Sequence, residues 1–343
     1  MIEPGALMGE RRRLTDLAYR LLGSVAEAED AVQEAYARWY AMPPEQQREI
    51  ASPAGWLTTV TGRICLDVLR SARARRERYV GEWLPEPVPG PTGADPADRI
   101  TLDESISMAF LVVLESMTPA ERVAFILHDV FGYPFSEVAE IVGRTPAACR
   151  QLAVSARRRI GAAQPPPAPA AATAGLVRAF KRAWEAKDLH ALITILDPGA
   201  VAVADGGGRA SALPDPLEGG ERIAHACVEW ASRAPELELV ETTVNGQPGL
   251  LGRLGGVPVA VWAFAVADGR IARIWAVRNP EKLRAWDGRL AGRPLSPAAC
   301  SGRAARGCAA PAPRARAPRG ARRAATTSPG RARPAAGCAP ACG

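Results

Sequence analysis

The sequence predicts a multidomain protein in which two all-α modules are followed by an α+β domain and a disordered, arginine-rich tail. The length of 343 residues suffices for two or three domains. Residues 8–78 and 102–160 have helical periodicity, whereas after residue 175 several segments alternate or run apolar as strands do. Beyond residue 288, Ala, Pro and Gly dominate, and such a composition cannot build a core.

The net charge of +7 is unevenly distributed along the chain. Residues 288–343 contain 11 Arg and no acidic residue, which leaves 32 basic and 36 acidic residues in the remainder. No apolar run approaches the roughly 18–20 residues that span a bilayer, and no secretory signal precedes the first module. We therefore expect a soluble, cytoplasmic protein with no membrane partner. The cysteines lack metal-ligand spacing, so neither a metal nor a cofactor is expected.

Capping residues mark the helix starts of the two α modules. Each of two capping boxes places a Glu three residues after a Ser or Thr, and two N-cap residues are followed by a proline at the first helical position. These four starts are Ser24–Glu27, Thr118–Glu121, Ser52-Pro53 and Thr145-Pro146. Between the modules, residues 79–101 contain too many Pro and Gly for a helix.

Residues 136–160 have the pattern of a helix-turn-helix. Gly143 suits the left-handed position after the first helix, and Thr145 caps the second. One side of the second helix is apolar, and the other carries arginines and a glutamine, which can pair with base edges and phosphates. The residues of that second side are Ala147, Arg150, Gln151, Val154, Arg157 and Arg158. This segment alone favours DNA binding; the alternative is a bundle helix with a solvated basic face.

The α+β domain follows a Pro/Ala linker, residues 162–174, which is expected to be extended. Residues 175–196 predict two short helices. Strands are predicted at 236–245, 257–267 and 271–277, with Asp268-Gly269 as a hairpin turn between the last two.

The two α modules resemble regions 2 and 4 of extracytoplasmic-function (ECF) sigma factors. The region 2 resemblance is carried by residues 28–34, Gly55-Trp56-Leu57 and residues 67–70, and region 4 opens at residues 117–122. Three further segments resemble markers of the subgroup with a SnoaL-like, NTF2-fold C-terminal domain. They are Trp83-Leu84-Pro85-Glu86-Pro87, Asp205-Gly206-Gly207-Gly208-Arg209 and Asn279-Pro280-Glu281-Lys282-Leu283. Family members commonly have Lys at the position of Arg209 and Asp at that of Glu281.

The resemblance assigns a domain to each stretch of the chain. The expected boundaries are region 2 at 8–78, a linker at 79–101, region 4 at 102–161, a Pro/Ala linker at 162–174, the SnoaL-like domain at 175–287 and the tail at 288–343.

The resemblance also implies partners and roles for particular residues. RNA polymerase core (the β′ clamp and the β flap) and promoter DNA are the implied partners, with an anti-sigma protein or a small ligand as further candidates. Core binding is expected at Glu29, Asp30, Gln33 and Glu34, and −10 DNA binding at Arg63, Asp67, Arg70 and Arg73. Binding to −35 DNA is expected at Thr145, Ala147, Arg150, Gln151, Arg157 and Arg158. Trp56 is expected to pack in the core rather than to stack on a base.

Regulation in cis is the hypothesis for the C-terminal domain, because its two marker loops and the linker marker otherwise have no role. The interdomain residues expected are Trp83, Leu84, Pro85, Asp205, Gly206, Gly207, Asn279, Pro280 and Leu283. Catalysis is not expected, since His190, expected just before a helix, and His225, expected in mid-helix, have no visible partner. The tail either adds nonspecific DNA affinity or has no role. The alternative function is a ligand-responsive helix-turn-helix regulator that never binds polymerase.

Overall fold

The structure is a computed structural model that describes residues 4–76, 79–90, 106–163, 169–213 and 215–287. The side chains of residues 4–9, 72–76 and 163 lie outside the description as well. The tail prediction, residues 288–343, falls on residues that are not described.

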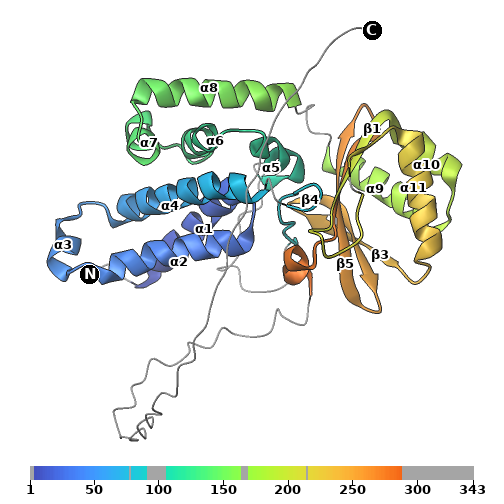
Figure 1. Ribbon diagram of the computed structural model, residues 1–343, viewed down its shortest axis with the longest axis horizontal. Coiled ribbons are helices and arrows are strands. Elements are labelled where there is room, and N and C mark those ends of the chain that lie inside the picture. The colour runs from blue at the N-terminus through green and yellow to red at the C-terminus, as the bar shows by residue number, and fades with distance from the viewer. Residues whose placement is uncertain (1–3, 77–78, 91–105, 164–168, 214, 288–343) are drawn as a thin grey trace, which may run out of the picture. The chain divides into compact units, whose positions relative to one another are not determined.

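The first module is a helical bundle. Its helices are α1 (Pro4–Leu22), α2 (Val25–Ala41), α3 (Pro44–Glu49) and α4 (Pro53–Arg76). Helices α1, α2 and α4 pack against one another (Figure 1). The predicted caps are present, because Ser24 Oγ accepts from Glu27 N and Ser52 Oγ accepts from Gly55 N. Trp56 packs edge-on against Trp39 with 5.3 Å between ring centroids, so its predicted place in the core is confirmed.

The second module is also helical and contains the predicted helix-turn-helix. Its elements are α5 (Met108–Glu115), α6 (Pro119–Phe125), the π-helical turn η3 (Ile126–Val130), α7 (Phe135–Val142) and α8 (Pro146–Ala163). The complete capping box of Thr118 and Glu121 starts α6. Gly143 ends α7 with φ 71°, and Thr145 Oγ1 accepts from Ala148 N to cap α8, as predicted.

The C-terminal domain packs three α-helices on one face of a curved mixed sheet and a 3-10 helix on the other (Figure 1). Its helices are α9 (Ala170–Glu185), α10 (Leu189–Ile195), α11 (Gly220–Arg233) and the 3-10 helix η4 (Pro280–Trp286). The strands are β1 (Leu196–Asp205), β2 (Leu217–Glu218), β3 (Glu238–Val244), β4 (Gln247–Leu254), β5 (Val257–Ala267) and β6 (Arg270–Val277). They lie in the order β2-β1-β6-β5-β4-β3, with β1 and β6 parallel. The predicted α+β class is confirmed.

Both faces of this sheet are buried. Along β5, Ala260, Trp262 and Phe264 belong to the core beneath the helices, whereas Val261 and Ala263 belong to a cluster on the opposite face. That second cluster also contains Leu84 from the linker and Met108 from α5. The apolar run over residues 257–267 therefore follows from burial on two sides.

Three expectations need correction. Strands β1, β2 and β4 were not predicted; β1 ends in a run of short Ala and Val side chains, and Gly249 and Gly252 interrupt the pattern of β4. Helix α9 begins at Ala170, so residues 170–174 are helical and not extended linker, because three alanines of high helix propensity follow Pro169. His190 lies inside α10, not before it.

Candidate functional site

The acidic surface of α2 is open to solvent. Glu29, Asp30, Gln33 and Glu34 are all exposed, while Ala28, Ala31, Val32 and Ala35 on the same helix are buried. Glu34 is held by Arg38 at 2.8 Å between Oε1 and Nε, an exposed pair that adds little stability. The helix therefore presents carboxylates and an amide to solvent.

Helix α4 presents Arg63, Asp67 and Arg70 on its exposed side. Arg70 Nη1 lies 3.3 Å from Asp67 Oδ1. Arg63 Nη2 donates to the backbone oxygen of Glu140 in α7 at 3.0 Å, so this residue contacts region 4. The side chain of Arg73 lies outside the described residues.

The second helix of the helix-turn-helix has a buried and an exposed side. Cys149, Ala153 and Ala156 are buried, and burial raises the pKa of the Cys149 thiol. The six residues expected at −35 DNA are all exposed: Thr145, Ala147, Arg150, Gln151, Arg157 and Arg158.

Two of these arginines have intramolecular partners. Arg157 Nε lies 2.6 Å from Asp129 Oδ1, and the Arg150 guanidinium lies over the Phe135 ring at 5.4 Å. Both arginine side chains nevertheless remain exposed to solvent.

A buried ion pair joins the linker to the C-terminal domain. Asp205, at the end of β1, is fully buried, and its Oδ2 lies 2.7 Å from Lys282 Nζ. The same carboxylate accepts from Leu84 N at 3.0 Å and from the Tyr79 hydroxyl at 2.7 Å. Burial, with the Asp205 carboxylate next to it, raises the pKa of Tyr79.

Lys282 completes this set of contacts, which we call the linker clamp (Tyr79, Trp83, Leu84, Asp205 and Lys282). Its ammonium donates to Leu84 O and lies over the Trp83 ring at 4.0 Å from the centroid. The buried cation therefore contacts a carboxylate, a carbonyl and an aromatic face.

The glycine loop after Asp205 allows the two marker loops of the C-terminal domain to meet. A Cβ on Gly207, whose φ is +60°, would lie 2.3 Å from Asn279 Nδ2 and 3.0 Å from the Tyr79 hydroxyl. A Cβ added to Gly206 would lie equally close to the carbonyl oxygen of Ala210. The structure thus leaves room at these positions for hydrogen alone.

The remaining interdomain residues differ in how far their side chains are buried. Leu84 and Leu283 belong to the cluster on the outer sheet face, and Pro85 is buried beside them in the chain. Pro280, by contrast, is exposed at the start of η4. Asn279 caps η4 by accepting from Glu281 N and donates to the Tyr79 hydroxyl.

A second connection, missed by the sequence analysis, centres on Asn245 in the β3–β4 turn. This residue is fully buried and has φ 50°. Its amide donates to the Tyr19 hydroxyl at 2.7 Å and to Ile106 O at 2.9 Å, and its oxygen accepts from Val88 N at 3.0 Å. One side chain therefore contacts α1, the linker and the segment before α5.

The linker carboxylate Glu86 contacts the first module directly. Its Oε2 accepts from Val25 N at 2.8 Å at the start of α2, where a carboxylate is favoured by the helix dipole. Burial raises the pKa of Glu86. The hydroxyl of Tyr19 donates to the Glu86 carbonyl at 2.8 Å.

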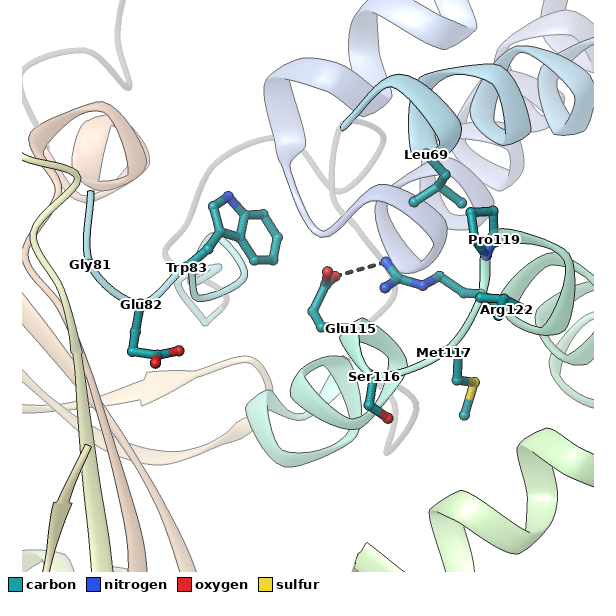
Figure 2. A pocket seen from close by; sticks show the side chains of 10 residues that line it. Leu69, Gly81, Glu82, Trp83, Glu115, Ser116, Met117, Pro119 and Arg122 are labelled. Carbon is teal, nitrogen blue, oxygen red and sulfur yellow. Dashed lines mark hydrogen bonds and ion pairs between the residues drawn. The ribbon is translucent and has the colours of Figure 1, made fainter. Parts of the chain in front are cut away.

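A cavity of about 510 Å³ opens where α4, the linker and the α5–α6 turn meet. Figure 2 shows Trp83 on one side and Glu115 pointing toward Arg122 on the other. Arg122 Nη1 donates to Glu115 Oε1 at 2.7 Å and to Leu21 O at 3.0 Å. Burial lowers the pKa of Arg122 to about 9.

The interior of the C-terminal domain is filled by aromatic rings. Trp184, Trp230 and Trp262 pack against one another with centroids 5.5–5.7 Å apart, and Phe180 meets Phe264 at 5.3 Å. His190 and His225 are exposed. Within the described part of the chain, no cluster of three or more His, Cys, Asp or Glu could hold a metal, and no helix is long and apolar enough to span a bilayer.

Known proteins match both helical modules and the chain as a whole. The Sigma-70 region 2 family matches residues 7–75, and the Sigma-70, region 4 family matches residues 107–160. The chain is 39% identical over 288 residues to the ECF RNA polymerase sigma factor SigJ of Mycobacterium tuberculosis (strain H37Rv), covering 80% of this chain and 90% of SigJ. It is 36% identical over 281 residues to the probable ECF RNA polymerase sigma factor SigI of Mycobacterium tuberculosis (strain CDC 1551), covering 81% and 93%.

A solved structure extends the match to the whole fold. The crystal structure of Mycobacterium tuberculosis SigJ is similar with a TM-score of 0.67 and 34% identity, covering 82% of this chain and 99% of that one. Two sigma-70 modules in this order, followed by the α+β domain, are thus shared with a sigma factor along nearly its full length. The chain belongs to the family of ECF RNA polymerase sigma factors, in the subgroup with a SnoaL-like C-terminal domain.

Proposed function

We propose that this sigma factor brings RNA polymerase core to its promoters through three separate surfaces and that its C-terminal domain controls their spacing in cis. The exposed acidic side of α2 suits a protein contact, because DNA phosphates would repel it. The arginines of α4 suit the −10 element, and those of α8 suit the −35 element. Since polymerase and chromosome share the cytoplasm, the chain acts there.

Polar contacts at both ends of the linker carry the regulatory part of this proposal. At one end Asp205 and Lys282 hold Leu84, and at the other Asn245 holds Val88. Directly after Val88, Pro89 forms an antiparallel bridge with Val244 of the edge strand β3. The segment that joins regions 2 and 4 is therefore bound to the C-terminal domain, so any change in that binding alters how far the regions can separate.

We propose no catalytic role for the C-terminal domain. Three tryptophans and two phenylalanines occupy the volume beneath its helices, and its two histidines lie on the surface. A general acid or base needs a partner and a substrate in a cleft. The domain instead supports the linker contacts.

In vitro transcription with purified polymerase core and a randomised promoter library tests the main proposal. We expect the full chain to form holoenzyme and to enrich promoters with defined −10 and −35 sequences. Asp30→Lys, on the acidic side of α2, should weaken holoenzyme formation at least about tenfold through charge repulsion. Glu49→Lys, which makes the same reversal of charge on the exposed surface of α3, is the control. Failure of the wild-type chain to bind core would refute the proposal.

A further inference from the structure

Region 4 packs directly on the helix proposed to bind the −10 element. Thr58 Oγ1 of α4 lies 2.9 Å from the hydroxyl of Tyr133, in the segment between η3 and α7. One turn further along α4, Gly62 faces Ile141 of α7, and Arg63 donates to Glu140 O. We call these contacts between residues 58–63 of α4 and residues 133–141 the seam.

The seam is tightly packed because α4 carries small residues there. Thr58 is 2% exposed, Gly62 is buried, and Ile141 is 4% exposed. A Cβ added to Gly62 would lie 2.9 Å from Cγ2 of Ile141. This methyl group is attached to the branched Cβ and cannot swing aside freely. The two modules consequently share one hydrophobic cluster that contains residues of α1, α2, α4, α6 and α7.

Two cation contacts join the modules beyond the seam. Arg122 of α6 donates to Leu21 O, in the last turn of α1, where helix carbonyls lack intrahelical partners. The Arg20 guanidinium of α1 lies over the ring of Phe131 at 5.6 Å. Regions 2 and 4 are therefore in contact along several elements.

This arrangement cannot read both promoter elements at once. Elements centred about 25 base pairs apart are separated by roughly 85 Å along B-DNA, at 3.4 Å per base pair. Helix α8 touches α7, which touches α4, and the 18 residues of α8 extend over only about 27 Å. The −10 and −35 surfaces must separate before both can bind.

We propose that the seam is an intramolecular latch: region 4 occupies the Gly62 side of α4 in the free protein, and promoter DNA and region 4 compete for α4. Arg63 takes part in both states, because the guanidinium that donates to Glu140 O when the seam is closed becomes available to a DNA phosphate when it opens. This inference rests on the proposed promoter binding by α4.

Two substitutions on opposite sides of the seam test the latch in the full-length chain. Gly62→Ala adds the methyl group that cannot fit against Ile141, yet alanine favours the helix of region 2. Tyr133→Phe removes only the hydroxyl that meets Thr58. Gly161→Ala is the matched control, a helical glycine of α8 with no atom within 4 Å of the added Cβ.

The readouts are the radius of gyration from small-angle X-ray scattering and the affinity for a single-stranded −10 oligonucleotide by fluorescence anisotropy. We expect both seam variants to be more extended and to bind the oligonucleotide at least about threefold more tightly, because affinity scales with the open fraction. Gly161→Ala should match the wild type.

Other outcomes would overturn the latch. These are seam variants equal to the wild type in both readouts, or a Gly161→Ala chain that changes as much as they do. Failure of the underlying promoter proposal looks different: the wild-type chain and both seam variants would then show no preference for a −10 sequence over a scrambled oligonucleotide, whatever their radius of gyration.

Discussion

Removing the buried cation of the linker clamp should release the linker from the C-terminal domain. Lys282→Met keeps a long, flexible side chain but leaves Asp205, which is fully buried, without its ionic partner. Breaking a buried ion pair from one side costs roughly 3–5 kcal/mol. Since Tyr79 and Leu84 still donate to the carboxylate, we expect the lower end of that range, about 3 kcal/mol.

Hydrogen exchange at the Leu84 amide measures this loss directly, because that N–H donates to Asp205. A loss of about 3 kcal/mol corresponds to roughly hundredfold faster exchange from the locally opened state. The control is Arg209→Gln, which breaks the neighbouring pair of Arg209 and Glu281, whose side chains are 63% and 48% exposed. Solvent screening limits that pair to about 0.5 kcal/mol. If Lys282→Met accelerates exchange no more than Arg209→Gln does, the clamp does not hold the linker.

Three further predictions concern single side chains. Arg150→Ala should weaken binding and relax selectivity at one −35 position by about 1–3 kcal/mol, whereas Arg158→Ala should weaken all duplexes alike, as competition among −35 variants will show. Asn245→Gly keeps the left-handed backbone but removes the buried amide; it should lower the protection of the Val88 amide by about 1–3 kcal/mol in hydrogen exchange. Burial raises the pKa of Glu86 above 4.5 in the folded chain, so stability falls as pH rises from 4.5 through the raised pKa. Glu86→Gln should therefore reduce the change of the thermal unfolding midpoint with pH over that range. An unchanged slope of midpoint against pH would contradict the assignment of this effect to Glu86.

The elements that were predictable from the sequence depend on short-range signals. The capping box at Thr118, the glycine that ends α7 and the Asp268-Gly269 turn each act within a few residues of the chain, and each is present in the structure. Strand β4 was missed because Gly249 and Gly252 lie where side chains would otherwise meet Trp262. Glycines chosen for close approach thus remove the alternation that reveals a strand.

Burial from a distant part of the chain was not predictable. Leu57, Val60, Ile64 and Val68 have the three- and four-residue spacing of a core stripe on α4, but the last three are only partly buried. Thr58, Thr61 and Gly62 are buried instead, because region 4 covers the other side of the helix. Small and hydroxyl side chains on an amphipathic helix resemble a solvated surface, and nothing nearby in the sequence indicates the covering module.

The same limit applies to the clamp. The three marker segments were recognised from the sequence, and the structure brings them together. Tyr79, which contacts both Asp205 and Asn279, lies outside those segments, and so does Asn245, which holds the linker at Val88. A buried Asn is improbable from composition alone, since its amide needs partners that the fold supplies from three separate elements.

The linker clamp and the seam restrain the same movement from two sides. The linker is bound to the C-terminal domain at Leu84 and Val88, while the seam at Gly62 holds regions 2 and 4 in contact. Releasing the linker alone leaves the contacts of the seam in place, and opening the seam alone leaves the contacts of Leu84 and Val88 with the C-terminal domain in place. Each set consists of a few contacts, polar in the clamp and both polar and apolar in the seam, and the chain keeps the partners of each set at high effective concentration. If promoter binding separates regions 2 and 4 as proposed, we expect both sets of contacts to break, and variants of either set should then change how readily α4 binds DNA.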